Sequence, residues 1–114
     1  MSIIQNICSL FFSSLALVSV ASAQDVFPSK AIRVVVPYPP GASTDGLARA
    51  FAQELAKELK VNVIVENKPG AGGALGAEIA AKALADGYTI FLGGVGSLAV
   101  NPQVMAKIAY DPVK

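Results

Sequence analysis

Three short runs of β-branched and aliphatic residues, each followed by a loop rich in glycine, proline or small polar residues, constrain the fold of this chain most. Residues 32–36, 61–66 and 88–92 are predicted strands, and helical spacing over 47–59 and 74–85 places a helix in each interval. The resulting order, β-α-β-α-β, requires parallel strands joined by right-handed crossovers. We therefore expect an α/β fold with sheet order 2-1-3 and helices on both faces.

The first predicted helix has a clear amphipathic pattern. Large apolar residues recur every four positions, alanines flank them, and we expect this stripe to face the sheet. Ser43 or Thr44 can cap the helix, and Asp45 suits the positive end of its dipole. The residues of the stripe are Leu47, Phe51, Leu55 and Leu59.

A second helix start is predicted farther along the chain, where Asn101-Pro102 can cap and open a short helix.

The first 23 residues contain no charged side chain and resemble a secretion signal. An apolar run over 10–20 is too short for a stable membrane anchor and is followed by the small-x-small pattern that ends at Ala23. We expect cleavage after Ala23 and an exported mature chain over 24–114. A buried N-terminal helix remains the alternative, because the segment lacks Lys and Arg. Cys8 lacks the context of a lipoprotein cysteine.

Composition excludes several classes of function. The formal net charge is +1, so there is no basic excess for binding nucleic acid. The chain has no His and one Cys, which excludes a His-based triad, a His-bearing zinc site and an internal disulfide. Ser43 and Ser97 lack a recognisable activating base, and Asp45 is more simply a helix-cap residue. These observations favour a binding protein over an enzyme, and no cofactor or metal is expected.

The loops that follow the three strands are predicted to share one edge of the sheet. In order 2-1-3, the first and third strands are neighbours whose following helices lie on opposite faces, which opens a crevice between their loops. Loops 38–46, 67–73 and 93–97 supply backbone amides, and the first also supplies hydroxyls. Such a site suits a carboxylate or another small anion. The alternative is an ordinary strand-to-helix turn whose Ser or Thr only caps the helix.

The second loop also invites comparison with a dinucleotide site. The segment from Gly70 to Gly76 reads G-x-G-x-x-x-G, but Leu75 occupies the last glycine position of the strict G-x-G-x-x-G pattern. The loop follows the second strand rather than the first. A tight turn with close helix packing is the better interpretation, and a Rossmann-like dinucleotide-binding enzyme fragment stays as the alternative.

Several segments, taken in order, resemble the Bug family, the TctC-like extracytoplasmic solute-binding proteins of tripartite tricarboxylate transporters. The resemblance covers essentially all of the predicted mature chain. It rests on residues 27–38, 40–45, 65–73, 86–89, 101–102 and 110–114.

This resemblance implies a periplasmic receptor with the type II periplasmic-binding-protein fold, whose two α/β lobes close on a small carboxylate. The ligand would be a di- or tricarboxylate, an acidic amino acid or an aromatic acid, which the receptor hands to membrane permease subunits. Carried over by motif, the ligand-binding residues are Tyr38, Ala42, Ser43 and Thr44, then Ala71 and Gly72, then Val95, Gly96 and Ser97.

The resemblance departs from the family pattern in two respects. The family usually has glycine where this chain has Ala42, and its members continue well beyond Lys114. We therefore expect residues 24–114 to form an incomplete N-terminal lobe, as a truncated product or a fragment. A non-functional remnant is a further alternative, because a three-stranded sheet of this size leaves apolar edges uncovered.

Overall fold

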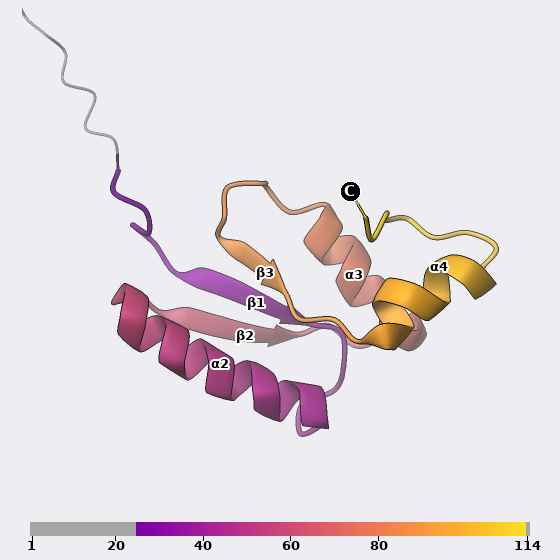
Figure 1. Ribbon diagram of the computed structural model, residues 1–114, viewed down its shortest axis with the longest axis horizontal. Coiled ribbons are helices and arrows are strands. Elements are labelled where there is room, and N and C mark those ends of the chain that lie inside the picture. The colour runs from indigo at the N-terminus through magenta and orange to yellow at the C-terminus, as the bar shows by residue number, and fades with distance from the viewer. Residues whose placement is uncertain (1–24, 114) are drawn as a thin grey trace, which may run out of the picture.

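The computed structural model describes residues 25–113, which form a three-stranded parallel sheet with helices around it (Figure 1). The strands are β1 (Ile32–Val36), β2 (Val63–Asn67) and β3 (Thr89–Phe91), in the order β2-β1-β3. In the register, Val34 lies opposite Val65 on one side and Ile90 on the other. The predicted α/β class and sheet order are confirmed. The predicted signal peptide lies outside the described residues.

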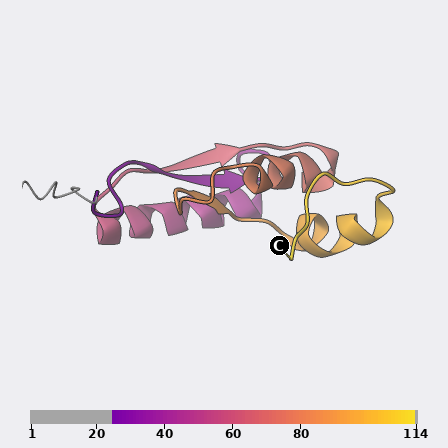
Figure 2. The ribbon, with the colours of Figure 1, turned by 90° about the horizontal axis from the view of Figure 1, so that it is seen from above.

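Two helices cover the sheet from opposite sides (Figures 1 and 2). Helix α2 (Ser43–Leu59) packs on β1 and β2, whereas α3 (Ala74–Ala81) packs on β1 and β3. This arrangement follows because the two right-handed crossovers, from β1 to β2 through α2 and from β2 to β3 through α3, run in opposite directions across the sheet. Helix α3 ends four residues earlier than the sequence predicts. The chain turns instead at Gly87, whose φ is +82°, and the Asp86 side chain accepts the Tyr88 N–H there.

The buried face of α2 differs from the face that the sequence predicts. Ala48 and Ala52 are the buried positions, whereas Leu47 is 64% exposed and Phe51 is 41% exposed. The alanines allow the helix axis to approach the strands closely, and the larger side chains then lie at the flank of the contact. Period-four spacing was the same for both sets, so it could not show which one faces the sheet.

The core is concentrated around the central strand. Val34 and Val36 pack with Ala48 on the α2 side, joined by half-buried side chains from all three strands. Val35 points to the α3 side because side chains alternate along a strand, and it is fully buried. The half-buried members are Tyr38, Val63, Val65, Ile90 and Leu92.

The third predicted loop is more helical than expected. Gly96–Val100 forms a π-helical turn, η2, that runs directly into the short helix α4 (Asn101–Val104). Asn101 therefore has helical backbone angles and does not cap a new helix, although Pro102 lies in the first turn as predicted. Among the described residues, no helix combines the length and apolar character needed to cross a membrane.

Candidate ligand-binding site

The segments that follow the three strands meet at the carboxyl edge of the sheet (Figure 1). We call them the first loop (37–42), the second loop (68–73) and the third loop (92–97). All three come together at Gly73, where an added Cβ would lie 3.1 Å from Ser97 Cβ and 3.4 Å from Pro37 Cβ. Gly73 also has a φ of +92°, which disfavours side chains. A glycine at this position thus allows all three loops to come together.

Tyr38 extends from the first loop to the third. A Cβ atom on Gly94 would lie 2.6 Å from Tyr38 Oη, and one on Gly96 would lie 3.8 Å away. Within residues 25–113, the Tyr38 hydroxyl makes no hydrogen bond to a protein group. The hydroxyl thus lies at the junction of the first and third loops.

The second loop holds an unusual backbone. Ala71 has a φ of +48° and Gly72 a φ of +62°. The left-handed region is uncommon for alanine, so the surrounding structure must hold it there. The Gly72 carbonyl accepts a hydrogen bond of 3.0 Å from Asn101 Nδ2, which ties the second loop to α4. The Asn101 side chain, predicted as a helix cap, thus holds the second loop instead.

The start of α2 supplies a different set of donors. The helix begins at Ser43, and Ala42 in the N-cap position has no side chain that can cap it. The prediction that Ser43 or Thr44 caps the helix is wrong, because both residues lie inside its first turn. Backbone N–H groups of a first turn have no intrahelical acceptor and carry partial positive charge. The Ala42 N–H donates to the Pro39 carbonyl at 3.3 Å. Ser43 and Thr44 therefore supply the N–H groups that would favour an anion here, and Ala42 lies beside them.

Asp45 is a buried carboxylate at the centre of this edge. It is 4% exposed and accepts hydrogen bonds from Arg49 Nε at 3.0 Å, from the Gly41 N–H at 2.9 Å and from Asn67 Nδ2 at 2.8 Å. The hydrogen bonds from Arg49, Gly41 and Asn67 lower the pKa of Asp45 to about 2. The carboxylate is therefore ionised at neutral pH and is a poor general base. Sequence reasoning missed Asn67, whose place at the end of a strand beside the first loop was the available signal.

The third loop places its predicted residues in different environments. Val95 is exposed and Gly96 is half-buried, whereas Ser97 is fully buried. The Ser97 hydroxyl donates to the Gly94 carbonyl at 3.1 Å and accepts the Gly94 N–H at 3.2 Å. Ser97 thus braces its own loop. A Cβ on Gly96 would lie 3.6 Å from the Gly72 carbonyl oxygen, so the second and third loops are in close proximity.

The glycine pattern of the second loop has a packing explanation. An added Cβ on Gly76 would lie 2.7 Å from Pro37 Cβ and 2.8 Å from Pro37 Cα. Helix α3 therefore lies directly against the first loop. This agrees with the interpretation of residues 70–76 as a tight turn with close helix packing.

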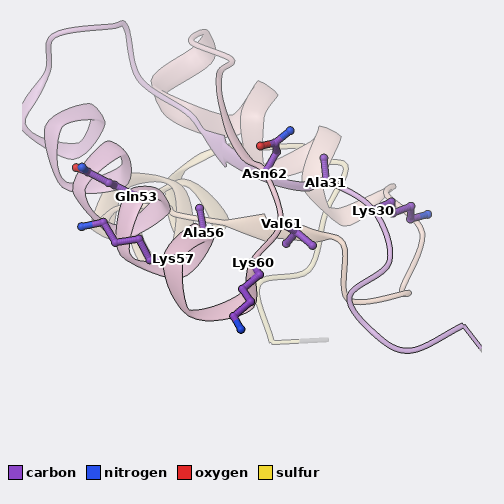
Figure 3. A pocket seen from close by; sticks show the side chains of 8 residues that line it. All are labelled: Lys30, Ala31, Gln53, Ala56, Lys57, Lys60, Val61 and Asn62. Atoms are coloured by element: carbon purple, nitrogen blue, oxygen red, sulfur yellow. The ribbon is translucent and has the colours of Figure 1, made fainter.

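A surface hollow of about 600 Å³ lies away from these loops, at the amino ends of β1 and β2 (Figure 3). Three lysines line it, and their amino groups point in different directions in Figure 3. Lys57 pairs with Glu54, and Lys30 pairs with Asp86. The three lysines are Lys30, Lys57 and Lys60. Their amino groups do not converge on one point, so the hollow is a poor site for an anion.

Known proteins resemble this chain in both sequence and structure. The family model described as "Tripartite tricarboxylate transporter family receptor" (TctC) matches residues 47–114. Protein BugT of Bordetella pertussis is 39% identical over 105 residues, which cover 91% of this chain and 32% of BugT.

Two solved structures match with similar coverage. A structure described as a periplasmic transporter is 52% identical with a TM-score of 0.75, over 77% of this chain and 30% of that one. MatC of Rhodopseudomonas palustris with bound malate is 40% identical with a TM-score of 0.73, over 77% and 30%. The chain spans about a third of the length of the relatives it matches. It belongs to the TctC family of tripartite tricarboxylate transporter receptors.

Proposed function

We propose that the carboxyl edge of the sheet forms one wall of a binding site for a small dicarboxylate in a periplasmic solute receptor. The observation that carries this proposal is a group of donors at that edge that have no partner within residues 25–113. They comprise the N–H groups of Ser43 and Thr44 in the first turn of α2 and the hydroxyl of Tyr38. Donors of this kind stabilise a carboxylate without needing a cationic side chain.

The proposed ligand-facing residues come from all three loops. Backbone groups contribute most of the contacts, because several of the residues are glycine or alanine. The Ser97 side chain acts indirectly in this proposal, by holding the third loop in shape. The set comprises Tyr38, Ala42, Ser43, Thr44, Ala71, Gly72, Val95, Gly96 and Ser97.

The ligand class is inferred from the family and from the chemistry of the edge. The structure of MatC contains malate, a four-carbon dicarboxylate, and shares the fold of this chain. The family consists of receptors rather than enzymes. Asp45, the acidic residue at this edge, has its carboxylate oxygens occupied by hydrogen bonds. Capture of the ligand, rather than its conversion, is therefore the proposed role.

One wall encloses a ligand only partly. We propose that residues 24–114 contribute to the first lobe of a two-lobed receptor, that residues 1–23 are a signal peptide cleaved after Ala23, and that the ligand passes to membrane permease subunits. Because a second lobe would supply the opposite wall, we expect this chain alone to bind dicarboxylates weakly, with a dissociation constant well above the micromolar range.

A chimeric receptor tests the proposal directly. Residues 25–113 replace the corresponding segment of MatC, and malate binding is measured by calorimetry. If this edge supplies its share of donors, the chimera should bind malate within about tenfold of the parent receptor. A matched chimera carrying Asp86→Asn, at the opposite end of the sheet, should bind equally well. A folded chimera that does not bind malate would disprove the proposed function.

A further inference from the structure

We infer that Asp45, Asn67 and Arg49 form a positioning network that holds the first loop in the shape its ligand contacts require. The network joins the loop to the end of a strand through hydrogen bonds at both ends of the turn. The consequence for ligand capture rests on the proposed function. The network itself can be tested without any ligand.

The hydrogen bonds hold the loop on both sides of Pro39 and Pro40. Asn67 Nδ2 donates to the Tyr38 carbonyl at 3.1 Å, which lies at the start of the turn. The Gly41 N–H donates to Asp45 Oδ2 at 2.9 Å, at the far side of the turn. Asn67 Nδ2 also donates to Asp45 Oδ1 at 2.8 Å, so the two clamps are connected. The path of the backbone between Tyr38 and Gly41 is thereby defined by two side chains.

Arg49 completes the network and sets the orientation of the amide. Its Nε donates to Asp45 Oδ2 at 3.0 Å, and its terminal nitrogen donates to Asn67 Oδ1 at 3.2 Å. The Asn67 oxygen therefore faces a donor while its nitrogen faces two acceptors. Rotating this amide by 180° would break all of these contacts, so only one orientation satisfies the network. The guanidinium also balances the charge of a carboxylate that is otherwise out of contact with water.

Aspartate is chemically necessary at the centre of the network. A carboxylate is an acceptor on both oxygens, and here both oxygens receive N–H groups. Asparagine would replace one oxygen with an NH₂ group. In place of Oδ1, the NH₂ group would face Asn67 Nδ2. In place of Oδ2, it would face the Gly41 N–H and Arg49 Nε. All three are donors, so neither orientation of the amide restores the hydrogen bonds. The Asp45→Asn variant keeps the volume and loses the pattern of acceptors.

The anchor of the network is rigid. Asn67 is the last residue of β2 and pairs in register with Val36 of the central strand. The Lys68 N–H donates to the Val36 carbonyl at 2.7 Å directly beyond it. Because Asn67 is fixed by the sheet, the loop is ordered before a ligand arrives. Preordering of this kind lowers the entropic cost of binding.

Amide hydrogen exchange of the purified chain, followed by NMR, tests the inference. In Asp45→Asn, the Gly41 N–H should exchange at least about tenfold faster, because it loses a hydrogen bond to a charged acceptor. The Ile32 and Leu92 amides, which donate to Asn62 and Val35 within the sheet, should change less than about twofold. Equal acceleration at all three amides, or no change at Gly41, would overturn the positioning role.

Asp86→Asn is the matched control. Asp86 also accepts a backbone N–H, that of Tyr88, and pairs with a cation, Lys30, but it lies at the amino edge of the sheet. In this variant the Tyr88 amide should exchange faster, while Gly41 stays as in the wild type. Faster exchange at Gly41 in this control would count against a local network.

A second variant and a ligand titration separate the remaining explanations. Asn67→Ala leaves the Asp45 contact to Gly41 in place, so Gly41 exchange should rise by a smaller factor than in Asp45→Asn. If Asp45→Asn does not fold, Asn67→Ala decides alone. An unchanged hydrogen-exchange rate of the Gly41 amide in that variant would refute the network. Malate added at high concentration should shift amide signals of the three loops in the wild type. Absence of those shifts contradicts the proposed function, whereas the exchange results decide the network independently.

Discussion

Substitution of two helical glycines by alanine should change stability in opposite directions. Gly46 lies in α2 with nothing within 4 Å of an added Cβ, whereas a Cβ on Gly76 in α3 would lie 2.7 Å and 2.8 Å from two atoms of Pro37. Alanine favours a helix over glycine by about 1 kcal/mol at either position. At Gly76 the neighbours are a proline ring and backbone atoms, which cannot rotate away. Overpacking of this kind costs about 3 kcal/mol, the upper end of the usual range. We therefore expect Gly46→Ala to stabilise by about 1 kcal/mol and Gly76→Ala to destabilise by about 2 kcal/mol.

Urea unfolding of the purified chain, followed by circular dichroism at 222 nm, measures both effects. With a slope of about 1 kcal/mol per molar urea, the two midpoints should differ by about 3 M. Because the small core limits the stability of the wild-type chain, all three proteins are unfolded in the presence of the same stabilising osmolyte. The reasoning is refuted if both variants are stabilised equally. That result would mean that α3 can move away from the first loop at no cost.

Three further predictions concern the candidate site. Tyr38→Phe in the MatC chimera should weaken malate binding about fivefold or more in calorimetry, with an unchanged melting temperature, because the hydroxyl makes no hydrogen bond to another residue of the described range 25–113. Equal affinity would contradict a ligand contact. Gly94→Ala in the same chimera should also weaken binding, because its Cβ would lie 2.6 Å from Tyr38 Oη and would displace that ring. Finally, the pKa of Asp45 is lowered from 3.8 to about 2, so its contribution to stability is complete above about pH 4 and is lost as the pH falls toward 2. Acid unfolding should therefore be less steep over this range in Asp45→Asn, and identical profiles would argue against that contribution.

The fold followed from the sequence because its signals are local. The β-branched run at 32–36 coincides with β1. The order of the elements along the chain was enough to predict a parallel sheet with the strand order β2-β1-β3. The ends of elements were less predictable. Ser43 and Thr44 became helical rather than capping, and residues 96–104 became continuous helical turns. Capping and helix ends depend on partners that are far away in the sequence.

The candidate site was predictable as a location and less so in its details. The three loops share one edge, as parallel topology requires. By contrast, the role of Asp45 required Asn67, which is 22 residues away, to come within 2.8 Å. The burial of Ser97 likewise depended on the packing of the second loop against the third.

The class of fold, the parallel sheet and the edge where glycines and small polar residues gather could all be predicted from the amino-acid sequence. These features depend on residue types and their spacing along the chain. The buried stripe of α2, the hydroxyls without a partner among the described residues and the side chains that hold the first loop became known from the packed structure. These depend on distances between segments, and small differences in side-chain size, such as alanine against leucine, decide how closely a helix approaches the strands.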